Sequence, residues 1–167
     1  PRFLLSLLFC FLATGVFSQG KTPKKAIKFL EMGIQQERYR DYEGAIEAYK
    51  QAIDVKSDYG EAWFRGGTCY YVLDSNKRCG EWMDKAMEYQ LNPRPTIYFY
   101  LAESAFYQEK WQKAADYYKT FDTKTANKPM PNKIRQEAEK NRKSAEYAVK
   151  NVGNRVMFDP NNLGDNI

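Results

Sequence analysis

The chain has 167 residues, of which 43% are hydrophobic and 28% charged, and its formal net charge is +5. This balance predicts a folded globular chain and argues against a disordered one. The chain contains no histidine, which removes the commonest general base and the commonest metal ligand from any candidate site. The lysines and arginines run together only as pairs, such as Lys24 and Lys25. The positive charge therefore indicates a solvated surface and argues against a nucleic-acid-binding one.

Residues 1–18 have the pattern of a signal peptide. Arg2 gives a positive start, residues 3–13 form an apolar run, and the small residues before Gln19 suit a signal peptidase. The apolar run is too short for a helix that spans a membrane. Two alternatives stay open: the segment could remain uncleaved as a membrane anchor, or Cys10 could be lipidated, although the bulky residue before Cys10 disfavours lipidation. Cleavage before Gln19 predicts an exported protein.

A pattern of bulky and small residues recurs three times between residues 26 and 128, at spacings of 34 and then 35 residues. The three copies are Phe29, Gly33, Ala45, Tyr49 and Ala52; Trp63, Gly67, Cys79, Met83 and Ala86; and Tyr98, Ala102, Ala114, Tyr118 and Phe121. We interpret each copy as two antiparallel helices that approach closely at their small residues, with Gly33 facing Ala45. Such units cannot bury their apolar faces alone, so they must stack. The predicted units are about 26–59, 60–93 and 95–128.

This pattern resembles the tetratricopeptide (TPR) family, whose period is 34 residues. The stretch from Arg40 to Ala45 is a particularly close match in the first unit. Further matching residues are Trp63, Gly67, Tyr70 and Ala86 in the second unit, and Leu101, Ala102, Trp111, Ala114, Ala115 and Tyr118 in the third. The chain departs from the family at Ser57, where the family has a proline, and in the turn of the second unit. The resemblance implies an all-α solenoid of helix-turn-helix units.

A further helix is predicted at residues 132–150, after a proline-containing break. Its apolar residues Ile134, Ala138, Ala145, Ala148 and Val149 form one stripe, and its other faces are highly charged. This pattern predicts a helix that caps the end of the stack. The alternative is a helix that docks a partner. The complete expectation is an all-α TPR solenoid of three helix-turn-helix units plus a C-terminal capping helix, preceded by a signal peptide.

Residues 151–167 read as a linker toward a further domain, because the helical pattern stops there and turn-forming residues follow. Phe158-Asp159-Pro160 and the stretch from Asn162 to Ile167 resemble part of the OmpA-family envelope proteins of Gram-negative bacteria. In that family, a signal peptide and TPR units lead into a WD40-like β-propeller and then a peptidoglycan-binding domain. The resemblance implies a protein of the periplasm or outer membrane, which would reach peptidoglycan only through such a downstream domain.

The TPR resemblance also implies a partner-binding groove, built by the first helix of each unit. The expected groove residues are Leu30, Ile34, Arg38, Phe64, Arg65, Thr68, Tyr71, Phe99, Glu103, Phe106 and Tyr107, with Glu37, Glu61, Val72 and Thr96 at neighbouring groove positions. Four of them, Phe64, Tyr71, Phe99 and Phe106, would form a partly exposed aromatic strip suited to the apolar anchors of a peptide. The alternative is that the capping helix or neighbouring side chains fill this strip as ordinary core.

We expect no catalytic, cofactor or metal site in this sequence. A Ser-His or Cys-His nucleophile cannot form without histidine, and Cys69 and Cys79 alone are too few to hold zinc. The two cysteines are interpreted as buried thiols, with a disulfide as the alternative in an oxidising compartment. Carboxylates such as Glu137 and Glu139 are interpreted as solvated charges on polar helix faces.

The sequence therefore predicts a scaffold of the cell envelope that binds a protein or peptide partner and is not an enzyme. Nucleic acid is not expected among its partners. One alternative function is that of a structural spacer in a peptidoglycan-anchoring protein. Another is that of a subunit of a secretion or gliding machine, which the OmpA-family resemblance permits.

Overall fold

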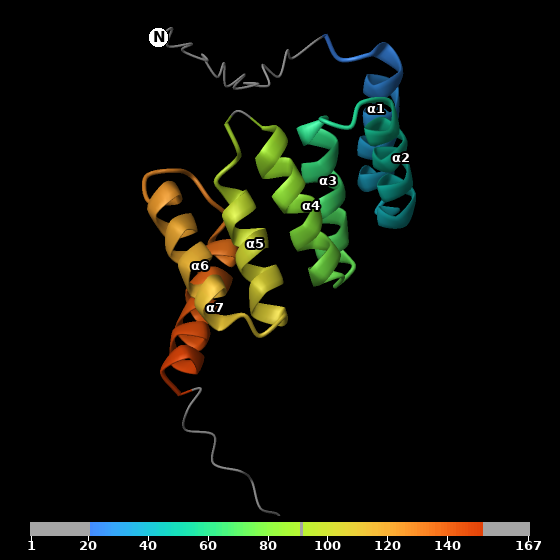
Figure 1. The fold of residues 1–167 in the computed structure, drawn as a ribbon. Helices are drawn as coiled ribbons and strands as arrows, with labels where there is room; N and C mark the ends of the chain where they lie inside the picture. Colours follow the sequence, from blue (N-terminus) through green and yellow to red (C-terminus); the bar gives the residue numbers. More distant parts are fainter. Residues whose placement is uncertain (1–20, 91, 152–167) are drawn as a thin grey trace, which may run out of the picture.

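The structure is a computed structural model that describes residues 21–90 and 92–151. The regular structure of these residues is entirely helical, as predicted (Figure 1). The helices are α1 (Lys24–Arg38), α2 (Tyr42–Val55), α3 (Gly60–Val72), α4 (Asn76–Tyr89), α5 (Thr96–Tyr107), α6 (Trp111–Thr125) and α7 (Asn132–Asn151). The predicted signal peptide at residues 1–18 and the predicted linker from residue 152 onward lie outside the described residues.

Consecutive helices form pairs, α1 with α2, α3 with α4 and α5 with α6, and each pair packs against the next (Figure 1). The turn inside each pair contains one residue with left-handed backbone, namely Arg40 (φ 61°), Asp74 (φ 54°) and Glu109 (φ 57°). A residue in this conformation lets the chain leave a helix and reverse its direction sharply. The three turn residues follow the repeat spacing of 34 and 35 residues, so the same reversal recurs in every pair.

The turn between α1 and α2 explains the close family match around Arg40. The carboxylate of Asp41 accepts a hydrogen bond of 2.9 Å from the backbone N–H of Gly44 and so caps the start of α2. The corresponding residue before α4 is Ser75, whose side chain makes no such capping bond. This difference matches the departure from the family pattern in the second unit.

Small residues of the first helices make room for bulky side chains of the second helices. The side chain nearest to Gly33 is the ring of Tyr49, and the methyl group of Met83 lies 2.8 Å from the point where Gly67 would carry a Cβ atom. Tyr49 and Met83 are fully buried. The space at Gly33 is therefore used by Tyr49, which lies one turn further along α2 than Ala45, the residue that the sequence predicts to face Gly33.

The last helix, α7, packs on α6 at the end of the row farthest from α1 (Figure 1). Ala138 and Ala145 are fully buried, and Ile134 packs half-buried against the same apolar cluster as Phe121. The predicted capping helix is thus confirmed. Among the described residues, no helix combines the length and the apolar character that crossing a membrane requires.

Candidate partner-binding face

The first helices of the three pairs lie along one side of the stack and form a surface that we call the inner face. A stack of helical pairs curves, and its first helices line the concave side. The inner face comprises Leu30, Ile34, Glu37 and Arg38 of α1; Glu61, Phe64, Arg65, Thr68, Tyr71 and Val72 of α3; and Thr96, Phe99, Glu103, Phe106 and Tyr107 of α5.

The predicted groove residues lie at three depths on the inner face. Leu30, Phe64, Phe99 and Glu103 are buried, whereas Ile34, Arg65, Thr68, Tyr71 and Phe106 are half-buried. Arg38, Val72 and Tyr107 are exposed, with 50% of Val72 and 60% of Tyr107 accessible to solvent. These three residues occupy the same place in the last turn of α1, α3 and α5. An exposed edge therefore runs across all three pairs.

Phe99 belongs to the core and is only 1% exposed. Its ring is enclosed by those of Tyr71, Tyr100 and Phe121, with ring centroids 5.8, 5.4 and 5.8 Å away, respectively. The prediction that Phe99 is partly exposed is therefore wrong. The alternative that neighbouring side chains fill this part of the strip as core is the correct one.

Phe64 is also shielded, with 9% of the residue exposed. The guanidinium group of Arg94 lies over its ring, 4.6 Å from the centroid, where the cation and the ring attract each other. The predicted partial exposure of Phe64 is wrong for this reason. Only Tyr71 and Phe106 keep the intermediate exposure expected of the aromatic strip.

A chain of ion pairs crosses the inner face from α1 to the segment before α5. Arg65 pairs through Nη1 with Glu37 at 3.2 Å and through Nε with Glu61 at 2.8 Å. The other carboxylate oxygen of Glu61 pairs with Arg94 at 2.8 Å. Glu37 also accepts a hydrogen bond from the hydroxyl of Tyr49. The side chains of Glu37, Glu61 and Arg65 are 24–30% exposed, so water screens these pairs less than it would at an open surface.

The α7 end of the inner face is covered by α7 itself. The hydroxyl of Tyr71 donates to Glu137 at 3.2 Å, and the amide of Asn141 donates to Glu103 at 3.0 Å. Glu103 also accepts from the hydroxyl of Tyr118, but its second oxygen has no partner among the described residues. Burial raises the pKa of Glu103, against the lowering effect of these hydrogen bonds. The capping helix therefore closes part of the predicted groove, an alternative that the sequence left open.

Two carboxylates of α7 that look equivalent in the sequence have different surroundings. Glu139 is exposed and pairs with Lys143 at 2.6 Å, as expected of a solvated charge. Glu137 is half-buried and holds Tyr71 on another helix. The interpretation of Glu137 as a solvated charge is therefore wrong, because the face of α7 that carries it turns toward α3 and α5.

Cys69 and Cys79 are free thiols, and both are buried. Burial raises the pKa of each thiol to about 12. Their thiolate populations at neutral pH are therefore very small, which gives them little nucleophilic character. Among the described residues, no group of three or more cysteine or acidic side chains is arranged to hold a metal ion.

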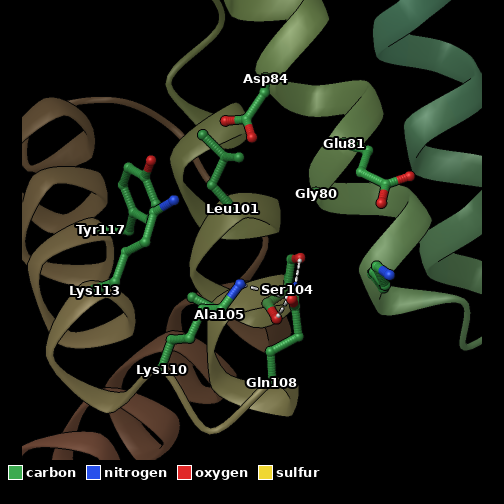
Figure 2. A pocket seen from close by; sticks show the side chains of 11 residues that line it. Gly80, Glu81, Asp84, Leu101, Ser104, Ala105, Gln108, Lys110, Lys113 and Tyr117 are labelled. Atoms are coloured by element: carbon green, nitrogen blue, oxygen red, sulfur yellow. Dashed lines mark hydrogen bonds between the residues drawn. The ribbon is translucent and has the colours of Figure 1, made fainter.

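A small pocket of about 180 Å³ lies between α4, α5 and α6, away from the inner-face ion pairs (Figure 2). Gly80 and Asp84 of α4 face Ser104 of α5 across it, and Lys113 of α6 closes one side. The amide of Gln108 donates to the carbonyl and hydroxyl oxygens of Ser104 at 3.0 and 2.9 Å. Small-molecule sites typically occupy roughly 300–1,000 Å³ and are mostly apolar. This pocket is smaller and is lined by charges of both signs, so the inner face is the better candidate site.

Sequence reasoning missed two contributors to the inner face, Arg94 and Asn141. Arg94 lies between two prolines, where the sequence indicated only a break, and Asn141 lies on a helix treated as a cap. Neither residue carries a local signal, because each meets its partner on another helix, 33 and 38 residues away in the sequence. The pair of Glu61 and Arg65 could have been found, since their spacing of four residues places them on one helix face.

Comparison of the sequence with protein-family models and with curated proteins finds no match. Solved structures of TPR domains, in contrast, are similar in fold. The TPR2B domain of yeast Sti1, in a pHsp70 complex, is 18% identical with a TM-score of 0.61, over 75% of this chain and 98% of that chain. The first TPR domain of Spaghetti (RPAP3), bound to the HSP90 peptide SRMEEVD, is 17% identical with a TM-score of 0.62, over 75% of this chain and 94% of that chain.

A third similar structure is the type III secretion chaperone SycD of Yersinia enterocolitica, in complex with a peptide of the translocator YopD. It is 12% identical with a TM-score of 0.63, over 74% of this chain and 93% of that chain. Identities of this size establish similarity of fold alone. The described part of the chain is therefore a TPR-type helical solenoid with a capping helix.

Proposed function

We propose that the protein is a non-catalytic scaffold that binds a segment of another protein on its inner face. The segment would lie across the last turns of α1, α3 and α5. Half-buried Ile34, Thr68 and Tyr71 would form the floor of the site, and exposed Val72 and Tyr107 would supply the apolar contacts.

One observation carries this proposal, namely the exposed edge formed by equivalent residues of successive first helices. Val72 and Tyr107 are 50% and 60% exposed at equivalent positions of neighbouring first helices, whereas the other exposed large apolar residues, Ile27, Met32, Tyr39 and Tyr147, lie outside the predicted groove positions. Apolar side chains next to each other on one face are the usual mark of a surface that binds a partner. Tyrosine in particular provides a large contact area at low entropic cost when it is immobilised.

The similar structures support the choice of an extended protein segment as the ligand class. The TPR domain of Spaghetti holds an HSP90 peptide, and SycD holds a peptide of YopD. A solenoid with a long, shallow inner face is suited to such segments because it offers contacts over several helices.

We further propose that this binding takes place in the cell envelope, where the partner would be another envelope protein. The support comes from the signal-peptide pattern of residues 1–18 and from the OmpA-family resemblance of the tail. N-terminal sequencing of the protein isolated from its own cells tests the export step. A new N-terminus at Gln19 is the expected result, and an N-terminus upstream of residue 13 would contradict it.

Binding can be tested with Val72→Ala and Tyr107→Ala combined in one variant. Random twelve-residue peptides displayed on phage are selected on the wild-type protein, and the enriched peptides are titrated against both proteins. We expect the double variant to bind about 2–4 kcal/mol more weakly, the usual range for aromatic hot spots. Its melting temperature should change little, because both side chains are already solvent-exposed.

Tyr147→Ala is the matched control. Tyr147 is 71% exposed and lies on α7, six residues after Asn141 and on a different side of the helix from the contact between Asn141 and Glu103. This variant should bind the peptides as the wild type does. Selection of no peptide, or equal binding by the wild type and the double variant, would argue against the proposed function and in favour of a structural spacer.

A further inference from the structure

We propose that the inner face selects partner segments that carry a basic side chain, which it receives beside Glu137 in the part lined by Tyr71 and Tyr107. The inference rests on the proposed function, because it names the chemical class of segment that the inner face would hold. Four properties of the inner face support it: the engagement of Arg65 and Arg94, the unpaired acids near α7, a buried carboxylate oxygen without a partner, and an exposed aromatic ring.

Two arginines of the inner face, Arg65 and Arg94, are already paired with the protein's own carboxylates. Arg65 has Glu37 on one side and Glu61 on the other, at 3.2 and 2.8 Å. Arg94 pairs with the second oxygen of Glu61 at 2.8 Å and also covers Phe64. An acidic segment would have to displace one of these carboxylates in order to reach a guanidinium group. The ion-pair chain therefore disfavours acidic side chains at Arg65 and Arg94. Arg38, at the α1 end of the face, is exposed and forms no ion pair among the described residues.

Toward α7 the charge balance is the reverse, because the acids lack basic partners. Within the described residues, no lysine or arginine forms an ion pair with Glu103 or Glu137. Burial raises the pKa of the Tyr71 hydroxyl, and the nearby carboxylates of Glu103 and Glu137 raise it further. The same two carboxylates raise the pKa of Tyr107, after the effect of burial. Both rings therefore lie within the electrostatic reach of two carboxylates.

Basic residues close in sequence to this region are directed to other contacts: Arg135 donates to the carbonyl oxygens of Thr125 and Lys128, and Lys110 donates to Gln108. Lys77 and Arg78 lie in the first turn of α4 and share a hollow with Tyr107 and Asp74. The guanidinium group of Arg78 lies over the ring of Tyr70, 5.7 Å from its centroid, and so packs against the other side of α3. Neither residue pairs with Asp74 in the described structure.

Beneath this acidic region lies a buried acceptor that has no donor. Glu103 is fully buried, its first oxygen accepts from Tyr118 and Asn141, and its second oxygen is without a partner among the described residues. Because Glu103 lies close to Glu137, one added positive charge beside them is favourable. The low polarity around the buried Glu103 strengthens the electrostatic attraction. A lysine ammonium or arginine guanidinium group would supply that charge.

The exposed ring of Tyr107 completes the chemistry for a basic side chain. Tyr107 is 60% exposed and lies on α5, the first helix next to the one that carries Tyr71. An aromatic face beside a carboxylate is a favourable setting for an ammonium or guanidinium group. Apolar residues on the α1 side of the basic residue would contact Val72 and Ile34. The segment expected is therefore one that carries a lysine or arginine followed or preceded by apolar residues.

The first test is an unbiased selection with random twelve-residue peptides on phage, scored for charge. We expect enrichment of peptides with a lysine or arginine next to apolar residues. The best peptide, made synthetically, should bind on the order of tenfold more tightly than its lysine- or arginine-to-glutamine counterpart. The peptide SRMEEVD, in which three acidic residues outweigh one arginine, should bind more weakly still. Enrichment of acidic peptides, or equal binding of the basic and glutamine peptides, would overturn the inference.

The second test compares Glu137→Gln with Glu139→Gln, the same change two residues apart on α7. Glutamine can still accept the hydrogen bond from Tyr71, so the first variant removes the charge and keeps the contact. We expect Glu137→Gln to weaken binding of the best peptide on the order of tenfold, and Glu139→Gln to leave it unchanged. Equal effects of the two substitutions would contradict the inference.

Two further measurements distinguish a failure of the charge preference from a failure of the proposed function. If Glu137→Gln lowers the melting temperature, the salt dependence of binding by the wild type tests the charge preference instead. An ion pair between the partners weakens as salt is added. Salt-independent binding would then overturn the inference. Selected peptides that are acidic but sensitive to the Val72→Ala and Tyr107→Ala double variant would defeat the charge preference alone. Peptides insensitive to that double variant would defeat the proposed function itself.

Discussion

Glu103 shows how one buried side chain joins the cap to the stack. It lies on α5, receives hydrogen bonds from Tyr118 of α6 and Asn141 of α7, and is fully buried. A carboxylate in this position connects three helices, but desolvation makes its charged form costly. The structure therefore balances the specific contacts of Glu103 against the burial of its charge.

The pH dependence of stability tests this balance in the variant Glu103→Gln. Because burial raises the pKa of folded Glu103, its contribution to stability is fully present below the unfolded pKa and is lost as pH rises through the folded pKa. The wild type should therefore gain stability relative to Glu103→Gln as pH is lowered from 7 toward 5. Urea unfolding of both proteins at several pH values measures the difference.

Glu139→Gln is the control for that experiment and should show the opposite trend. The hydrogen bond and charge of Lys143 lower the pKa of Glu139, so its contribution is present above the unfolded pKa and is lost as pH falls through the folded pKa. A pH-independent difference between the wild type and Glu103→Gln would mean that Glu103 is solvated in the folded protein.

The depth of individual inner-face residues could not be read from the sequence. Phe99 and Phe106 both lie at groove positions of α5, yet Phe99 is buried and Phe106 is half-buried. The repeat spacing fixes which side of the helix each residue occupies, and this was enough to identify the inner face. It does not say that Tyr71 and Phe121 enclose Phe99, because these contacts join residues 22 to 28 positions apart in three different helices.

At the level of helices, α3 and α4 are held together by close approach at two adjacent glycines. A Cβ atom on Gly66 would collide with the ring of Trp82, which is itself packed edge-on between Trp63 and Tyr70 at centroid distances of 4.8 and 5.3 Å. A Cβ atom on Gly67 would meet the flexible methyl end of Met83 at 2.8 Å. The two glycines therefore differ in how well their surroundings can adapt to an added methyl group.

We predict that Gly66→Ala destabilises the protein and that Gly67→Ala is close to neutral. Replacing a helical glycine by alanine favours the helix by about 1 kcal/mol. At Gly66 overpacking against a fixed indole ring should cost about 1–3 kcal/mol and outweigh this gain, whereas at Gly67 the methionine can move. Thermal or urea unfolding of the two variants measures the difference, and a more stable Gly66→Ala would show that α3 and α4 are packed less closely.

The capping helix illustrates what an apolar stripe can and cannot predict. Ala138 and Ala145 identified the face that packs on α6, and both are fully buried. The polar contacts made by Glu137 and Asn141 are invisible to such a pattern, since both residues look like ordinary surface positions of a charged helix. These contacts make α7 part of the inner face as well as the end of the stack.

For the molecule as a whole, the fold was predictable because each repeat carries the same local signals. The small residues, the turn positions and the bulky residues recur at a spacing of 34 or 35 residues, and stacking follows from faces that no single pair can bury. The openness of the inner face was not predictable. It depends on Arg94, which covers Phe64, and on α7, whose Glu137 and Asn141 contact Tyr71 and Glu103. Both lie outside the pattern.

The inner face is consequently divided into a covered part and an open edge. Phe64, Phe99 and Glu103 are internal to the protein and stabilise it, whereas Arg38, Val72 and Tyr107 are available to a partner. A partner segment would therefore follow the ends of the first helices and would not occupy the full width of the surface. This placement is the central claim about how the molecule works.

Backbone amide chemical-shift mapping tests that claim most directly. A peptide selected on the protein is titrated into isotope-labelled protein, and the amide shifts are followed residue by residue. The largest shifts should fall in the last turns of α1, α3 and α5, around Arg38, Val72 and Tyr107, and in the part of α7 near Glu137. Shifts concentrated instead on α4 and α6, around the pocket of Asp84 and Lys113, would contradict the account.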